Sequence, residues 1–511
     1  MKTYKQNCFY RHRWQCLVFL SEFIYMGLEL NASRIMSPAF GTTLDIWSSI
    51  IGIILASSAI GNWLAGHLSD RAEIRHIWIV RCLFICAFWL AFVPILYASL
   101  INSGLHANLP HIVAALIACI ALFMIPGICI GMLTPLVLAQ YADEQKLEIG
   151  RASSGFYAAM TLGGLAGTFS TGFYLVPTLG SNNLTVAMSI AMAILGILSA
   201  TILRRLKAKE NIGFIIATIV LLIVITCVNI MHKTTSDVDI WVDTQYGRAR
   251  VFDSKQENRP IRNLLVSGGY ESAMFLDNKG KTELVFDYLK TAAKITRNSI
   301  KEDDSVLCLG GGAYSFPKYL AYNKKAKVDV VEIDKEITSL AQKYFFLDEV
   351  SKKSKHKINT YTGDGRVVLS DLKTKNYSMI FNDTFAGESP AATLSTLEAA
   401  KEIKSSLAPN GLYMMNIMGI YNDAANEFLG WEVKTLRGVF GVVRVFHSYD
   451  KEHFSSDTQQ NWIVVATDDT KWNPPKSLYE VKPNLDGAKI LTDDYCPVDY
   501  LTARLQFVRE R

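Results

Sequence analysis

Long apolar runs in the first half of the chain constrain its fold more than any other feature. Residues 14–231 consist largely of such runs, whereas residues 236–511 have the mixed composition of an ordinary soluble α/β protein. A helix that spans a lipid bilayer needs roughly 20 apolar residues. With 511 residues the chain is also too long for one compact core. We therefore expect a transmembrane domain at 1–235 and soluble domains after it.

Seven segments are apolar enough to be spans: about 14–34, 43–66, 77–100, 111–140, 154–178, 183–203 and 212–231. Lys and Arg gather before the first segment and in every second loop. By the positive-inside rule this pattern predicts a multi-pass protein of the plasma (inner) membrane with a cytoplasmic N-terminus. Seven spans would then leave the soluble part outside the cytoplasm. A nucleotide ligand is more naturally found inside, so the side of the soluble part stays open.

The charged residues and the cysteines limit which ligands and partners we expect the chain to bind. The net charge of +5 is modest, and its basic residues lie at the flanks of the apolar segments, so the bilayer and not a nucleic acid accounts for them. The nine cysteines form no CxxC or Cys/His spacing, so we expect no metal. No small-residue cleavage site follows the first apolar segment, which we interpret as a span and not as a signal peptide.

Two features within the apolar part bear on packing and function. The stretch "GGLAG", residues 163–167, has the small-xxx-small spacing that lets helices approach closely. The first segment carries Glu22, Glu29 and Arg34. Intramembrane charge usually faces a cavity or a partner, so these residues indicate either a ligand path or a buried ion pair.

The soluble part divides in two by its patterning. Residues 236–298 contain short alternating runs with glycine turns, which predict a small antiparallel β unit, and a connecting helix at about 281–297. From 299 to 511, strand and helix patterns alternate: "SVLCLGGG", "KVDVVEID", "KINTYTGDGRVVLSDL", "YSMIFNDTF", "APNGLYMMNIMG" and "WIVVATD" hold the expected strands. This alternation is typical of a parallel, doubly wound Rossmann-like sheet.

Residues able to bind an adenosine group follow four of these strands in order. Open α/β sheets bind ligands at the carboxyl ends of their strands, so these positions share one edge. A glycine loop permits close backbone approach, a carboxylate about twenty residues later suits ribose hydroxyls, and further carboxylates can accept from an adenine amine or point into the cleft. The candidates are Gly310, Gly311, Gly312, Glu332, Asp364 with its neighbour Gly365, and Asp383.

These blocks together resemble the spermidine synthase (polyamine aminopropyltransferase) family, and more closely its membrane-fused branch with an N-terminal multi-pass domain. The resemblance covers about 238–500 and rests on "YGRARVFD", "LLVSGGYESAMF", "VLCLGGGAYSFPKYL", "VDVVEIDKEI", "GDGRVVL", "NDTFAGESPAATLSTLEAAKEIKSSLAPNGLYMMNI" and "LTDDYCPVDYL". It implies a small β domain followed by a Rossmann domain of the S-adenosylmethionine-dependent methyltransferase type. Soluble members are often dimers or tetramers, so a homo-oligomer is a further expectation.

The resemblance also implies a reaction and roles. An aminopropyl group passes from decarboxylated S-adenosylmethionine to an amine such as putrescine, and methylthioadenosine leaves. Asp383 matches the aspartate that accepts the amine's proton, Glu332 the ribose-binding glutamate and Asp364 the adenine-binding aspartate. No metal takes part.

This sequence departs from the family where the amine is bound. Ala313 and Ala386 stand where the family usually has aspartates that bind the donor's amine and the polyamine. Tyr270 or Glu271 stands where Gln is usual, and "YLK", beginning at Tyr288, takes the place of Tyr-His-Glu. Glu271, Asp287 and Glu388 are candidates for replacement charge.

Three functions therefore stay open. The first is a membrane-bound aminopropyltransferase. The second is another S-adenosylmethionine-using enzyme, a methyltransferase or a sulfonium-cleaving lyase, because fewer carboxylates near the donor's tail would suit a donor that carries its own. The third is a transporter or sensor whose soluble domain binds a nucleoside, which the charged first segment favours.

Overall fold

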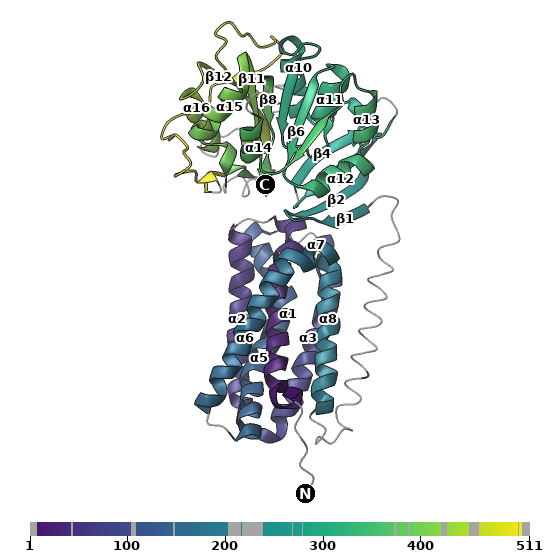
Figure 1. Ribbon diagram of the computed structural model, residues 1–511, viewed down its shortest axis with the longest axis vertical. Coiled ribbons are helices and arrows are strands. Elements are labelled where there is room, and N and C mark those ends of the chain that lie inside the picture. The colour runs from purple at the N-terminus through teal and green to yellow at the C-terminus, as the bar shows by residue number, and fades with distance from the viewer. Residues whose placement is uncertain are drawn as a thin grey trace. The chain divides into compact units, whose positions relative to one another are not determined.

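The chain forms two compact units, Met1–Asp237 and Val238–Arg511 (Figure 1). The computed structural model describes residues 8–41, 44–103, 109–146, 149–202, 216, 239–267, 269–277, 280–372, 376–386, 389–420, 427–448, 459–498 and 500–502. Each unit has hydrophobic clusters of its own. We describe the two units separately.

The first unit is helical. Its elements are α1 (Cys8–Phe40), α2 (Leu44–Ser69), α3 (Ala72–Asn102), α5 (His111–Gln145), α6 (Ile149–Ser170), the π-helical turn η1 (Thr171–Leu175), α7 (Val176–Leu179) and α8 (Ser181–Ile202). Within the described residues, five helices are long and apolar enough to cross a membrane: α1, α2, α3, α5 and α8. This confirms five of the seven expected segments as long apolar helices.

The other two expected segments are not confirmed as long apolar helices. The segment expected at 154–178 is helical, as α6, η1 and α7 in succession, but is not among the five. The segment expected at 212–231 lies outside the described residues, apart from Ile216.

Glycines let pairs of these helices approach closely. A Cβ atom added at Gly163 or Gly167 of α6 would lie 2.2 Å from the carbonyl oxygen of Phe19 or Phe23 of α1, respectively. Such a distance is far below van der Waals contact, so no larger residue fits without moving a helix. The packing role predicted for "GGLAG" is therefore confirmed.

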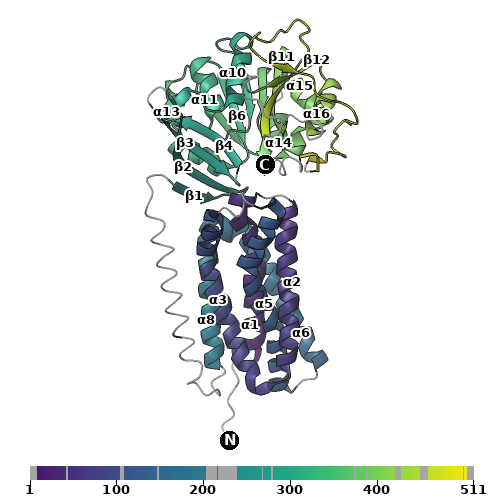
Figure 2. The same ribbon diagram turned by 180° about the vertical axis from the view of Figure 1, so that it is seen from behind.

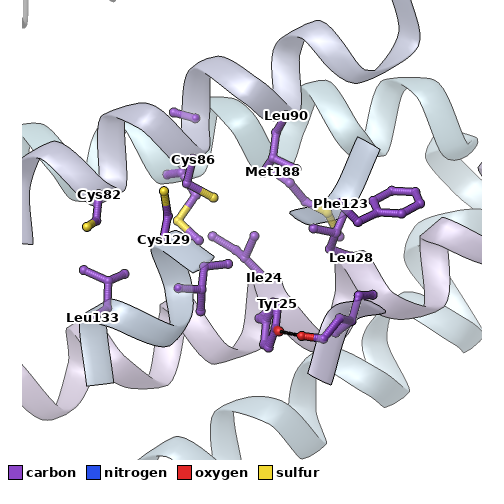
Figure 3. Close-up of a cluster of buried hydrophobic side chains, with 14 of the residues drawn as sticks. Ile24, Tyr25, Leu28, Cys82, Cys86, Leu90, Phe123, Cys129, Leu133 and Met188 are labelled. Carbon is purple, nitrogen blue, oxygen red and sulfur yellow. Dashed lines mark hydrogen bonds between the residues drawn. The ribbon is translucent and has the colours of Figure 1, made fainter. Parts of the chain in front are cut away.

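Side chains from α1, α2, α3, α5, α6, α7 and α8 form the core of this unit, and Figure 3 draws part of it. Tyr25 of α1 is buried there, and its hydroxyl donates a hydrogen bond to the carbonyl oxygen of Ile54, 2.9 Å away (Figure 3). Around it lie side chains from α1, α3, α5 and α8, among them Ile24, Leu28, Cys82, Cys86, Leu90, Phe123, Cys129, Leu133 and Met188. The buried hydroxyl is thus satisfied by backbone, as a buried polar group must be.

The second unit begins with a small antiparallel sheet, visible from behind in Figure 2. Its strands are β1 (Asp239–Asp243), β2 (Arg248–Gln256), β3 (Arg259–Val266) and β4 (Gly269–Phe275), each paired with the next. The 3₁₀ turn η3 (Gly280–Thr282) and the helix α10 (Asp287–Ser299) follow.

An eight-stranded sheet with the order β14-β12-β13-β11-β8-β5-β6-β7 forms the rest of the unit. Its central strands are parallel, and β13, β12 and β14 extend it antiparallel. The strands are β5 (Ser305–Leu309), β6 (Lys327–Glu332), β7 (Asn359–Thr362), β8 (Tyr377–Asn382), β11 (Leu407–Ile420), β12 (Val442–His447), β13 (Gln459–Thr467) and β14 (Glu480–Val481). The short strands β9 (Phe385–Ala386) and β10 (Ser389–Pro390) pair separately.

Helices cover both faces of this sheet. They are α11 (Ser315–Asn323), α12 (Lys335–Tyr344), α13 (Leu347–Lys353), α14 (Gly365–Asp371), the 3₁₀ turn η4 (Ala392–Leu394), α15 (Leu397–Ser406) and α16 (Glu427–Arg437). In β5, Leu307 packs in one cluster with α15 and α16, whereas Cys308 packs in the other with α10 and α11. Alternate residues of a central strand are thus buried on opposite faces, which explains the almost continuous apolar runs of the predicted strands.

One helix, one turn and two strands differ from the sequence prediction. The helix expected at 281–297 begins only at Asp287, since residues 280–282 form the turn η3, Leu284 and Val285 are buried, and Phe286 has extended dihedral angles (φ −79°, ψ 137°). The turn expected at "PNG" lies within β11, where Asn410 has φ 64° and the pairing with β8 shifts register. The strands β12 and β14 were not predicted.

Candidate active site

The glycine loop, Glu332 and Asp383 meet at one edge of the sheet. Backbone hydrogen bonds continue the sheet ladder past the strand ends, since Gly310 N donates to Val331 O and Asp383 N donates to Leu309 O, both at 2.9 Å. The carboxyl ends of β5, β6 and β8 therefore lie side by side, as the sequence predicted.

The loop takes glycine because neighbouring atoms crowd it. Gly310 has φ 86°, and an added Cβ would lie 2.3 Å from the carbonyl oxygen of Asp383. Gly312 has φ 51°, and its Cβ would lie 2.9 Å from Ser272 Oγ. Both positions thus combine a left-handed backbone with close contact. The loop fixes the backbone of Asp383 on one side and contacts the small sheet on the other.

Glu332 binds this loop directly. Its Oε2 accepts hydrogen bonds from Gly311 N at 2.8 Å and Gly312 N at 3.1 Å, and its Oε1 accepts one from Asp334 N at 3.0 Å. Burial raises the pKa of this carboxyl, while the three backbone donors act in the opposite direction. The side chain therefore ties the end of β6 to the glycine loop.

Asp383 is held on both carboxylate oxygens. Tyr288 Oη donates to Oδ2 at 2.9 Å, and Asn416 Nδ2 donates to Oδ1 at 2.8 Å. The Asn416 amide is oriented in turn by Asn461, whose Nδ2 donates to Asn416 Oδ1 at 3.0 Å. Burial raises the pKa of Asp383, and the two hydrogen bonds partly offset that effect. The result is an oriented carboxylate, poised to accept a proton closer to neutral pH than a free aspartate would.

Glu271 of β4 adds a third carboxyl group to this edge. Its pKa is raised to about 8, first by burial and then by the charges of Asp383 and Glu332. The same Asp383 charge, after burial, raises the pKa of the Tyr288 hydroxyl. The raised pKa values favour the neutral forms of these three carboxyl groups in the empty site, and a cationic ligand beside them would favour the ionised forms.

Other predicted residues lie differently. Asp364 caps α14, since its Oδ1 accepts hydrogen bonds from Arg366 N at 2.8 Å and Val367 N at 3.2 Å. Its neighbour Gly365 is the first residue of that helix and lies against Leu394.

The remaining acceptor-site candidates are scattered. Tyr270 is 59% exposed, with its ring centroid 6.3 Å from that of Phe252. Asp287 forms an ion pair with Lys290 on the surface of α10, 2.8 Å apart. Glu388 lies outside the described residues. Of the two candidates for replacement charge that the structure describes, Glu271 is the one whose pKa is raised by the charge of Asp383.

Three residues at the site were missed from the sequence. Asn416 and Asn461 orient Asp383, and Ser272 Oγ accepts a hydrogen bond from Ala313 N at 3.1 Å. A signal existed for Asn416, the polar residue inside the apolar strand "LYMMNIM". Asn461 and Ser272 give no comparable signal, because their partners are distant in sequence.

A family model described as "Spermine/spermidine synthase domain" matches residues 285–422, which include the glycine loop, Glu332 and Asp383. Over these residues the second unit is similar to spermidine synthase domains. The resemblance predicted from the sequence is thereby confirmed, with the apolar helices lying N-terminal to the matched residues.

Curated relatives of this domain carry matching names. The chain is 31% identical over 162 residues to "Polyamine aminopropyltransferase" of Vibrio vulnificus (strain CMCP6), which covers 31% of this chain and 50% of that protein. It is 26% identical over 272 residues to "Probable polyamine aminopropyl transferase" of Bifidobacterium longum (strain NCC 2705), covering 48% of this chain and 58% of that protein. The chain thus spans about half the length of the Vibrio relative. Both relatives are therefore named as transferases.

Among solved structures, the chain is similar to "a probable spermidine synthase from Corynebacterium glutamicum ATCC 13032". The TM-score is 0.40 at 20% identity, covering 47% of this chain and 84% of that one.

Proposed function

We propose that this chain is a membrane-bound spermidine synthase-like transferase. It moves an aminopropyl group from decarboxylated S-adenosylmethionine to a small amine such as putrescine and releases methylthioadenosine. The family match at the site and the names of the curated relatives support the aminopropyl transfer. They give no support to a methyltransferase, a lyase or a nucleoside sensor.

The proposed reaction needs little covalent chemistry from the protein. The amine nitrogen forms a bond to the terminal aminopropyl carbon as the carbon–sulfur bond breaks, and the electron pair stays on sulfur, which becomes a neutral thioether. The proton lost by the nitrogen passes to Asp383. The sulfonium is already a good leaving group, so alignment and proton removal are the main tasks.

The observation that carries this proposal is the environment of Asp383. Its carboxylate is fixed by Tyr288 and Asn416, and its backbone lies against Gly310 of the loop. We propose that this loop and Glu332 hold the donor's adenosine part, with Asp364 at the adenine. The base would then lie beside the donor's reacting carbon.

Glu271 would supply charge that this sequence lacks elsewhere. Ala313 is fully buried among apolar side chains of the small sheet and α12, so that position contributes no charge. Glu271 comes from the adjacent strand and lies near both Asp383 and Glu332, as the cause of its raised pKa indicates. We propose that it binds a cationic amine of the donor or of the acceptor.

The first unit would anchor this chemistry at a bilayer. Its five long apolar helices and the basic residues at their flanks support membrane insertion with a cytoplasmic N-terminus. A reporter fused to the C-terminus distinguishes the two topologies. Seven spans predict that a periplasmic reporter is active, whereas an active cytoplasmic reporter would require an even number of spans.

Product analysis by mass spectrometry tests the reaction. Purified full-length protein is given S-adenosylmethionine or its decarboxylated form, each with and without putrescine. The proposal expects methylthioadenosine and spermidine only with the decarboxylated donor and the amine together. Methylthioadenosine or S-adenosylhomocysteine from the ordinary donor would contradict it.

A further inference from the structure

A cavity of about 470 Å³ lies in the second unit at a place that the proposed reaction does not use. It is bounded by η3, α10 and α11, and the last two lie side by side in both views of the molecule (Figures 1 and 2). We call it the α10 pocket, and its lining includes Leu284, Lys290, Ala293, Lys294, Arg297 and Tyr319. Its volume is in the range of small-molecule sites.

Positive charge dominates this pocket. Lys290, Lys294 and Arg297 follow one another at helical spacing, so α10 presents them on one face. Among the described residues, Lys294 and Arg297 form no ion pair, whereas Lys290 is paired with Asp287. The acidic lining residue Glu283 is already bound by Arg259, with 2.8 Å between Oε2 and Nη2. Two cations are therefore left without a carboxylate partner.

The surroundings add to this charge. The Lys324 ammonium donates a hydrogen bond to Arg297 O at 3.0 Å, which brings another cation to the end of α10. Leu284, Ala293 and the Tyr319 ring supply an apolar side to the same pocket. A guanidinium beside an ammonium is the pairing that recognises phosphate oxygens, and the apolar side can cover an organic part.

We propose that the α10 pocket binds a phosphate-bearing small molecule, with Lys294 and Arg297 contacting the phosphate. The site is separate from the glycine loop, and its occupancy does not depend on the reaction proposed above. The phosphate could be carried by a soluble metabolite or by a lipid headgroup, and the chemistry of recognition is the same for both.

The pocket is also placed to affect the candidate active site. The helix α10 carries Tyr288, whose hydroxyl binds Asp383, two residues before the pocket residue Lys290. Tyr319 stacks on Phe316, which packs on Phe381 of the strand that leads to Asp383, with ring centroids 6.0 Å and 4.7 Å apart. Ligand binding in the pocket is thus expected to change the affinity for an adenosine ligand, and by linkage the reverse.

The binding test uses inorganic pyrophosphate as the probe, titrated calorimetrically into the full-length protein in detergent. The variant Lys294→Gln/Arg297→Gln should bind it at least about tenfold more weakly, because two charge-assisted contacts are lost. Ala293→Trp, which keeps the charges and fills the pocket, should weaken binding as well. The control Lys352→Gln/Lys482→Gln removes two exposed cations elsewhere and should bind like the wild type.

Equal affinity in the charge variant and the control would overturn the proposal, as would undiminished binding by Ala293→Trp. Repeating the titration in nanodiscs of phosphatidylcholine alone and with phosphatidylglycerol distinguishes the sources of phosphate. Competition by phosphatidylglycerol, lost in the charge variant, assigns the pocket to a lipid headgroup, and unchanged affinity assigns it to a soluble phosphate. An affinity for methylthioadenosine that is the same with and without pyrophosphate would overturn the coupling to the active site.

Discussion

At the scale of single residues, the candidate site depends on how burial tunes a few carboxyl groups. Asp383, Glu332 and Glu271 all have raised pKa values, and burial is the largest cause for each. Glu332 and Asp383 differ in their hydrogen-bond donors. Glu332 accepts hydrogen bonds from backbone amides, whereas Asp383 accepts them from side chains. This difference suits a structural anchor in the first case and a proton acceptor in the second.

Asp383→Asn should nearly abolish turnover while keeping the affinity for methylthioadenosine. The amide cannot accept the amine's proton, and a general base typically contributes ~10²–10⁴-fold. Steady-state rates and calorimetric binding check the two halves of the prediction. Asp287→Asn is the control, since that carboxylate is paired with Lys290 on the surface of the same helix that carries Tyr288. Turnover retained in Asp383→Asn would remove Asp383 from the mechanism.

Glu271 should make ligand binding pH-dependent. With a pKa of about 8 it is mostly neutral at pH 7 in the empty site, and a bound cation favours its ionised form. The affinity for the cationic donor should therefore rise as pH increases toward 8. At pH 7, binding should release a proton from Glu271, which the buffer takes up. Calorimetry in buffers of different ionisation enthalpy measures this proton release. In Glu271→Gln the release should disappear, and if it persists another group is responsible.

The same raised pKa has a consequence for folding. An unfolded Glu271 ionises near 4.5, whereas the folded protein keeps its proton up to about 8. Stability conferred by the neutral form is therefore present below pH 4.5 and is lost as pH rises to 8. Glu271→Gln should accordingly melt at a higher temperature than the wild type at pH 8, which tests the burial independently of any ligand.

At the scale of elements, the strands β11 and β13 support the end of β8. Their asparagines, Asn416 and Asn461, form a short relay of hydrogen bonds to Asp383. In the antiparallel pairing of β11 with β13, Asn461 is the register partner of Met418, two residues after Asn416, which brings the two asparagines together at this edge. The antiparallel extension of the sheet thus contributes to the site, although the expected chemistry lay on the parallel strands.

Asn416→Ala should lower turnover about tenfold and move the acidic limb of its pH profile to higher pH. The lost hydrogen bond favoured the charged carboxylate, so its removal raises the pKa of Asp383. Rates measured from pH 5 to 9 check both effects. Asn461→Ala acts only through Asn416 and should shift the profile in the same direction by less. A loss of rate without any shift would indicate a merely structural role.

Much at this scale was readable from the sequence, for identifiable reasons. The parallel strands were predicted because they are apolar throughout, and Gly310, Glu332 and Asp383 because each lies at the carboxyl end of a strand. The start of α10 was not predicted, since the burial of Leu284 and Val285 and the extended dihedral angles of Phe286 depend on tertiary contacts. The roles of Asn461 and Ser272 likewise depend on pairing between segments that are distant along the chain.

At the scale of the whole molecule, two units with different physical chemistry share one chain. The first is stabilised by close helix contacts at glycines, and the second by a sheet buried on both faces. Composition indicates a division of this kind, because the apolar runs end near residue 231. The expected segment at 154–178 differs, because α6 is as long as α8 but is not among the five helices that are apolar enough to cross a membrane, and it continues through η1 into α7.

Gly163→Leu should destabilise the first unit, because the side chain would be forced against the backbone of Phe19. Overpacking of this kind costs about 1–3 kcal/mol or more. The melting temperature of the full-length protein in detergent, followed by tryptophan fluorescence, should fall. The control is Gly66→Leu in α2, where an added Cβ meets no atom within 4 Å. Equal stability of the two variants would show that the close contact does not matter.

The hydrogen-bond acceptor positions of Glu332 limit how a ribose can bind there. Two carboxylate oxygens offer about four acceptor positions, and backbone amides of Gly311, Gly312 and Asp334 occupy three of them. A ribose bound as proposed can therefore donate one hydroxyl proton without disturbing the protein. Its second hydroxyl can donate a hydrogen bond to Glu332 only after an amide of the glycine loop has given up its own hydrogen bond to that carboxylate. Recognition of the sugar would therefore involve a movement of the loop as well as the carboxylate itself.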